Sequence, residues 1–226
     1  ALCVNPVECY VKVRKNDEGK VYYMAEALVE KVLGEDVEIL ERYTGKDLEY
    51  REYEPLFNFV TPKKKAYYVT CADYVTLTDG TGVVHTAPAF GEDDSQVGRR
   101  YDLPFVQLVN EKGEMTEETA WAGKFCKDAD LPILQDLEDR GLLYDAPKFE
   151  HSYPHCWRCD TPLIYYARES WFIKMTAVKD DLIRNNNTIN WIPESIGKGR
   201  FGDWLENVQD WGISRNRYWG TPLNIW

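Results

Sequence analysis

The sequence predicts an α+β protein, mainly β, built as a closed or nearly closed β-barrel with peripheral helices. Short apolar or alternating runs recur along residues 1–150, and such runs are typical of strands. Helical patterns are few and short. Many short strands are accommodated best when a sheet closes on itself and the helices stay on its surface.

Strands are expected wherever apolar residues alternate or run together between turn signals. The first, over residues 1–13, is interrupted at Asn5-Pro6. Asp79-Gly80 is expected to form a hairpin-type turn before a short buried strand at Val83-Val84. The full set of expected strands is 1–13, 37–43, 67–71, 74–77, 83–84, 105–109 and 142–144.

Helices are expected where the apolar period changes to that of a helix. Residues 23–33 place apolar side chains on one face, and Gly34 suits the position after a helix end. Residues 130–140 are bounded by Pro132 near the start and Gly141 beyond the end, an arrangement that helices favour.

Composition limits the classes of function. The chain has 226 residues, is 44% hydrophobic and 29% charged, and has a net charge of −11, which excludes a large nucleic-acid footprint but allows contact with one end of a nucleic acid. No apolar run is long enough for a membrane span, so we expect no membrane partner. Six cysteines without a secretory signal indicate a reducing cytoplasm, where we expect the protein to be located.

Residues 80–94, Gly-Thr-Gly-Val-Val-His-Thr-Ala-Pro-Ala-Phe-Gly-Glu-Asp-Asp, concentrate the candidate chemistry. His85 follows the short strand, and Asp93 and Asp94 lie in the acidic first turn of a helix that runs to about Tyr101. Small polar substrates are often held at such strand-to-helix turns. Residue types alone favour a structural interpretation, in which His85 is a satisfied strand-end histidine and the carboxylates merely complement the helix dipole.

This stretch resembles the signature of the editing domain of isoleucyl-tRNA synthetases, the insert called connective polypeptide 1. The resemblance implies a β-barrel decorated by helices, of the type shared by valyl, isoleucyl and leucyl synthetases. It assigns residues 1–150 to the editing barrel and residues 151–226 to an incomplete return segment that leads to the class I catalytic core. The stretch from Trp211 to Trp219 resembles the part of the synthetases where that return occurs.

The resemblance also assigns site residues. Asp94 and His85 are the expected catalytic residues: Asp94 anchors the α-ammonium of an aminoacyl ester, and His85 lies beside the substrate side chain and ester. Water attacks the ester directly, since no nucleophilic Ser or Cys has a base partner. Further substrate-binding residues are expected at Gly80, Thr81, Gly82, Thr86, Asp93 and Tyr153.

Each of these further assignments has a structural alternative. Asp93 is the less favoured carboxylate, and Thr81 and Thr86 are more often structural. Tyr153 matches a residue at the rim of the site but could be a packed core tyrosine. In the family, a Thr-rich segment that lies before the position matching Ala1 also contributes to the pocket.

The function implied is hydrolysis of valine from mischarged tRNA(Ile), and of misactivated valine, within an isoleucine–tRNA ligase. The expected partners are the tRNA(Ile) 3′ end carrying valine and the rest of the synthetase chain, with the protein a monomer. Editing requires no cofactor, and ATP is used only by the catalytic core, of which this chain shows no nucleotide loop. The alternatives are a non-catalytic tRNA 3′-end binding module and a structural insert that holds zinc.

Cys156-x-x-Cys159 has the spacing of a zinc knuckle, with His155 beside it. A structural zinc needs four ligands, and the chain has no second Cys-x-x-Cys. In the resembling family a matching cysteine pair can come from an earlier part of the insert. Cys156 and Cys159 are therefore expected to be half of a split zinc site or, alternatively, two free thiols.

Overall fold

The computed structural model describes residues 1–148, 150, 152–217 and 219–225. They form two compact units, residues 1–167 (unit 1) and residues 168–226 (unit 2). The functional division predicted at residues 150 and 151 stays a prediction.

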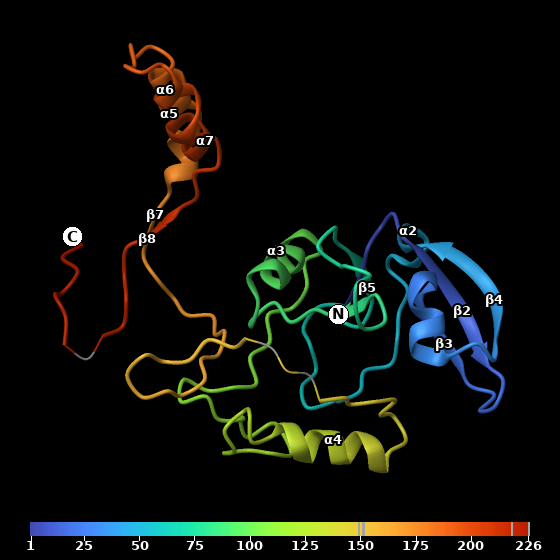
Figure 1. The fold of residues 1–226 in the computed structure, drawn as a ribbon. Helices are drawn as coiled ribbons and strands as arrows, with labels where there is room; N and C mark the ends of the chain where they lie inside the picture. Colours follow the sequence, from blue (N-terminus) through green and yellow to red (C-terminus); the bar gives the residue numbers. More distant parts are fainter. Residues whose placement is uncertain (149, 151, 218, 226) are drawn as a thin grey trace. The chain divides into compact units, whose positions relative to one another are not determined.

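The larger sheet of unit 1 is antiparallel, with β2 at its centre and the strand order β3-β2-β4 (Figure 1). Its strands are β2 (Cys9–Lys15), β3 (Val21–Ala25) and β4 (Val37–Thr44). The turn between β2 and β3 needs Gly19, which has φ 66° and donates its N–H to the Lys15 carbonyl at 2.8 Å. The strand predicted at 37–43 is confirmed by β4.

The larger core lies beneath this sheet. Tyr10, Val11, Val13 and Met24 are almost completely buried there. The helix predicted over 23–33 is wrong in its first part, because β3 occupies 21–25 and Met24 pairs with Val11. A 3-10 turn, η1 (Glu26–Leu28), and α1 (Val29–Leu33) follow it.

The helix ends are specified locally. Gly34 follows α1 with φ 81°, as predicted. Thr44 and Asp47 form a capping box for the short helix α2 (Gly45–Leu48).

The smaller sheet of unit 1 has the order β5-β1-β6. Its strands are β1 (Leu2–Val4), β5 (Val69–Cys71) and β6 (Val83–His85). β1 lies parallel to β5 and antiparallel to β6. A small core of Cys3, Ala72, Val75 and Val97 lies against it, with Tyr74 and Tyr101 packed alongside.

Two helices of unit 1 agree with prediction: α3 (Glu92–Arg100) and α4 (Asp130–Asp139). The strands predicted at 74–77, 105–109 and 142–144 are wrong, since these segments are turns and loops. Asp79-Gly80 therefore turns the chain without making a hairpin, because β6 pairs with β1 instead. Val84 of β6 is 38% exposed, so the expectation of a buried strand is also corrected.

The α+β class is confirmed, with less strand than predicted. Within the described ranges the strands form two three-stranded sheets and one two-stranded sheet, and no closed barrel is detected. No helix of the described residues is both long enough and apolar enough to cross a membrane.

Most of the regular elements of unit 2 are short helices (Figure 1). The indole of Trp191 donates to Asn186 Oδ1 at 2.9 Å, and Asn186 Nδ2 donates to the Gly197 carbonyl at 2.9 Å, which joins the helices. Leu205 and Val208 are buried. The elements are β7 (Phe172–Ile173), η2 (Met175–Val178), α5 (Lys179–Asn186), α6 (Ser195–Lys198), α7 (Arg200–Glu206) and β8 (Trp211–Gly212), with β7 antiparallel to β8.

Candidate functional site

The signature stretch forms a strand, a turn and a helix, as predicted. His85 ends β6 opposite Leu2, and the Thr86 N–H donates to the Ala1 carbonyl at 2.8 Å. The chain then turns, and α3 begins after Gly91, which adopts an extended conformation as the N-cap. The end of β6 and the start of α3 are therefore neighbours at one edge of the smaller sheet.

The turn packs tightly against α3 because Gly98 has no side chain. A Cβ at Gly98 would lie 2.9 Å from both Cβ and Cγ of Pro88, closer than ordinary side-chain contacts allow. Pro88 is rigid and could not yield easily. This close approach brings the backbone of Ala87 to the first turn of α3.

Asp94 is held through both carboxylate oxygens. The Ala87 N–H donates to Oδ2 at 2.9 Å, and the Tyr74 hydroxyl donates to Oδ1 at 3.1 Å. Asp94 is half-buried, whereas Asp93 is exposed. The fixed and sheltered carboxylate is thus Asp94, in agreement with the preference for it over Asp93.

Asp94 has no cationic partner in the described part of the chain. No Lys, Arg or terminal amino group there comes within 4.0 Å of its oxygens. A carboxylate that is oriented but not neutralised is suited to attract an ammonium ion.

His85 is exposed at the strand end, yet surrounding protein partly desolvates its ring. This desolvation lowers the pKa of His85, and Asp94 opposes the effect. The neutral imidazole is consequently favoured at neutral pH. It can donate or accept a hydrogen bond without repelling a nearby cation.

Gly80, Thr81 and Gly82 lie at the opposite end of β6 from His85. The Gly82 carbonyl accepts from the Tyr10 hydroxyl at 2.7 Å, and the Thr81 carbonyl accepts from the Ala25 N–H at 2.9 Å. These bonds attach the loop to the larger sheet, about 10 Å along the strand from His85. The substrate-binding roles of Gly80, Thr81 and Gly82 stay predictions.

Thr86 adjoins His85 but is buried, with 1% of its surface exposed. Its Oγ1 has no hydrogen-bond partner among the residues that the structure describes. Its predicted contact with substrate is untested.

Tyr153 belongs to a loop later in unit 1. Its hydroxyl donates to the Leu163 carbonyl at 2.6 Å, and Lys127 Nζ lies 4.9 Å from its ring centre. The ring also meets His155 edge-on. Its predicted place at the rim of the site stays a prediction.

Cys156 and Cys159 lie on one tight turn. The Cys156 N–H donates to the Thr161 carbonyl at 2.9 Å, and the Asp160 N–H donates to the Cys156 carbonyl at 2.8 Å. Hydrogen bonds from Thr161, and then from Cys156, lower the pKa of Cys159, which favours the thiolate that metals bind. No group of three or more His, Cys, Asp or Glu side chains gathers at a metal-sized site within the described ranges.

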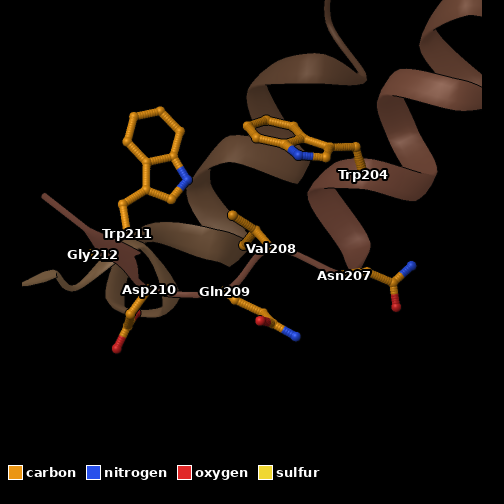
Figure 2. Close-up of a pocket in the computed structure, with 7 residues that line it drawn as sticks. All are labelled: Trp204, Asn207, Val208, Gln209, Asp210, Trp211 and Gly212. Carbon is orange, nitrogen blue, oxygen red and sulfur yellow. The ribbon is translucent and has the colours of Figure 1, made fainter. Parts of the chain in front are cut away.

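A pocket of about 420 Å³ lies in unit 2, and its lining includes no residue of the signature stretch. Figure 2 shows the rings of Trp204 and Trp211 on one side of the 207–210 segment, with Asn207, Gln209 and Asp210 directed to the other. Asp210 is already engaged, because it accepts from the N–H and the hydroxyl of Thr176 at 3.0 and 2.8 Å. The volume alone does not make this pocket a reactive site, because Asp210 is the one titratable side chain in its lining.

The sequence analysis missed both groups that hold Asp94. Tyr74 was expected to belong to a strand, and nothing in a separation of twenty residues indicates contact with Asp94. The Ala87 donor is a backbone N–H, which every residue except proline has, so the residue types do not indicate this contact.

The comparisons with known proteins agree with the signature. The family described as tRNA synthetases class I (I, L, M and V) matches residues 11–226. The isoleucine–tRNA ligase of Clostridium novyi is 55% identical over the whole chain, and that of Bacillus thuringiensis is 51% identical. The chain spans 22% of the length of each of these relatives.

Two solved structures are also similar. The crystal structure of GlLeuRS-CP1 has a TM-score of 0.48 and 16% identity, covering 65% of this chain and 78% of that one. The editing domain of the P. knowlesi cytosolic leucyl-tRNA synthetase has a TM-score of 0.35 and 19% identity, covering 45% and 46%. At these values the two structures do not define the fold of this chain.

Proposed function

The chain belongs to the class I tRNA synthetases of the isoleucine, leucine, methionine and valine group, and from this premise we propose that it edits valine for an isoleucine–tRNA ligase. The reaction is hydrolysis of the ester in valyl-tRNA(Ile), extended to misactivated valine before transfer. The barrel, the monomeric state and the cytoplasmic location expected from the sequence belong to the same proposal.

Editing compensates for the limited selectivity of a single amino-acid pocket. Isoleucine and valine differ by one methylene, which a single apolar pocket rejects only weakly, and isoleucyl-tRNA synthetase is itself the standard illustration of this limit. A second site that admits only the smaller amino acid and hydrolyses its ester restores accuracy. Such a site needs an anchor for the α-ammonium, and it needs a water molecule aligned with the ester carbonyl.

The observation that carries this proposal is the state of Asp94. Its carboxylate is oriented by Ala87 and Tyr74, is half-buried, and has no cation within 4.0 Å among the described residues. The α-ammonium of a valyl ester would supply the missing cation through a short charge-assisted hydrogen bond.

His85 complements this anchor. The imidazole is kept neutral by its lowered pKa, so it can hydrogen-bond the ester or the attacking water without competing for Asp94. No covalent intermediate is part of the proposal, and water carries out the attack. The proton balance is simple: water adds to the carbonyl, valine leaves as the free acid, and the tRNA terminal hydroxyl takes a proton.

Zinc has only a structural place in this proposal. Cys156 and Cys159 fit one half of a tetrahedral site, because both thiols lie on one turn and the pKa of Cys159 is lowered. Two further ligands would come from outside the described residues. When bound, the ion would stabilise the fold and take no part in hydrolysis.

The decisive test is Asp94→Ala in the full-length synthetase that contains this chain. Loss of a charged hydrogen-bond partner should slow deacylation of valyl-tRNA(Ile) by about tenfold to a hundredfold. Isoleucine activation, measured as ATP–pyrophosphate exchange, should be unchanged, since the carboxylate acts only in the second site.

Glu92→Ala is the matched control, because it removes another carboxylate from the same first turn of α3. Normal deacylation by the Asp94 variant would refute the proposal. A loss confined to Asp93→Ala would instead move the anchor by one residue.

A further inference from the structure

We propose that Tyr74 is a positioning residue for editing, whose hydroxyl fixes the Asp94 carboxylate in the orientation that receives the substrate ammonium. This inference rests on the proposed function and adds to it a residue that neither the signature stretch nor the comparisons single out.

The geometry shows why two donors are needed. A carboxylate can rotate about its Cβ–Cγ bond, and the Ala87 N–H alone, at 2.9 Å from Oδ2, leaves that rotation possible. The Tyr74 hydroxyl, at 3.1 Å from Oδ1, engages the other oxygen. Each oxygen keeps a further lone pair, so the carboxylate plane is fixed while the remaining lone pairs stay available.

Tyr74 is itself well anchored. Its ring packs against the smaller core of Cys3, Ala72, Val75 and Val97. Burial raises the pKa of Tyr74, with Cys3 acting in the same direction, so the hydroxyl keeps its proton at neutral pH and serves as the donor. The position of the hydroxyl is thereby set by the core rather than by solvent.

A tyrosine has an advantage over a lysine or an arginine at this position. A basic side chain would orient Asp94 equally well, but it would form an ion pair and compete with the substrate ammonium. A neutral hydroxyl donates one hydrogen bond and leaves the negative charge in place. The structure thus combines orientation with an uncompensated charge, as the capture of an ammonium requires.

The test uses Tyr74→Phe in the full-length synthetase, because phenylalanine keeps the packed ring and removes only the donor. Deacylation of valyl-tRNA(Ile) should slow by about fivefold to thirtyfold. Asp94→Ala should lose more, and the double variant should be within about twofold of Asp94→Ala, because Tyr74 acts through Asp94. Tyr68→Phe is the matched control, since its hydroxyl bonds the Tyr101 carbonyl in the same unit.

A second substrate separates positioning from general support of the fold. In 2-hydroxyisovaleryl-tRNA(Ile), a hydroxyl replaces the α-amino group of valine. Tyr74→Phe should slow its deacylation less than twofold, because there is no ammonium to place. The ratio of the two rates also cancels any shared loss of folded protein.

The outcomes distinguish the two proposals. Normal deacylation by Asp94→Ala would overturn the proposed function. Impaired Asp94→Ala with normal Tyr74→Phe would overturn only the role of Tyr74. Additive losses in the double variant, or equal losses on both substrates, would show that Tyr74 merely supports the fold and would also overturn its positioning role.

Discussion

The larger sheet of unit 1 has strands of seven, five and eight residues, whereas every strand of the smaller sheet has three. The first rests on an extended core that includes Tyr10, Val11, Val13 and Met24. The second has a small core, and side-chain hydrogen bonds supplement it. The proposed chemistry belongs to the second.

Those supplementary bonds tie strands to neighbouring segments. The buried Thr70 hydroxyl donates to the Leu2 carbonyl at 2.9 Å, and the Cys71 N–H donates to the Tyr101 hydroxyl at 3.1 Å. Hydrogen bonds fix direction, whereas apolar contacts mainly fix proximity. This difference indicates that the larger sheet supplies most of the stability of unit 1, whereas the smaller sheet controls the direction of polar groups.

The largest effect is expected from a matched pair of core substitutions, Val11→Ala and Val75→Ala. Both side chains are almost fully buried, one in each core. Val11→Ala should lower the free energy of unfolding by about 2 to 4 kcal/mol, and Val75→Ala by about 1 to 2 kcal/mol, because a small core can relax around the cavity. Amide hydrogen exchange of β2 and β6 reads the two sheets separately.

Equal losses of unfolding free energy for the two valine substitutions would contradict this difference, since the two cores would then contribute equally to stability. A larger loss for Val75 would reverse it.

The next effect is a difference between two glycine substitutions where the two sheets meet, at Gly80 and Gly82. Both glycines have φ 71°, so alanine meets the same backbone strain at either, about 1 to 2 kcal/mol. Only at Gly82 would the new Cβ also meet neighbours, Ala25 Cβ at 2.5 Å and Leu77 Cδ2 at 2.9 Å. Gly82→Ala should therefore cost about 1 to 3 kcal/mol more than Gly80→Ala in urea unfolding.

A difference near zero would mean that the loop shifts freely, and that the larger sheet does not hold the start of β6 in place.

The smallest effect concerns pH and His85. Burial holds the pKa of His85 below the value of about 6.5 that an unfolded chain shows. Between those two values the unfolded state binds more protons, so stability should fall as the pH drops below about 6.5 and should be unaffected by His85 above it. Urea unfolding of the wild type and of His85→Asn over pH 5 to 8 measures the difference between their stabilities, which should change below about pH 6.5 and be constant above it.

A difference of the opposite sign would show that the attraction of Asp94 for protonated His85 outweighs its desolvation.

Sequence patterns predicted correctly those elements whose ends and periodicity are set by residues close in sequence. The period and end signals of α3 and α4, the break at Asn5-Pro6 and the glycine after α1 all appear in the structure. The failure at 23–33 has a tertiary cause, because the same apolar spacing allows Met24 to pair with Val11 in a sheet. The loop at 74–77, in which Val75 is buried, shows that an apolar run can pack without a strand partner.

The site was predictable only in part, for a related reason. The residue types and the resemblance single out His85 and Asp94, which lie at adjoining ends of β6 and α3. The support for Asp94 depends on Tyr74 and on the Ala87 N–H, which meet it only because Gly98 admits Pro88. Contacts of this kind depend on how the chain folds back, and residue spacing does not report them.

The pairing of β1 has a consequence for the order of folding. The strands β2, β3 and β4 are consecutive and need close only short loops, whereas β1 pairs with β5 and β6, and its Leu2 carbonyl meets Thr70, 68 residues away. Closing long loops costs more entropy and is slower than closing short ones. The larger sheet can thus assemble while later residues are still being synthesised, and the smaller sheet must wait until residue 85 has emerged. The proposed site is therefore completed only after the larger sheet can already serve as its scaffold.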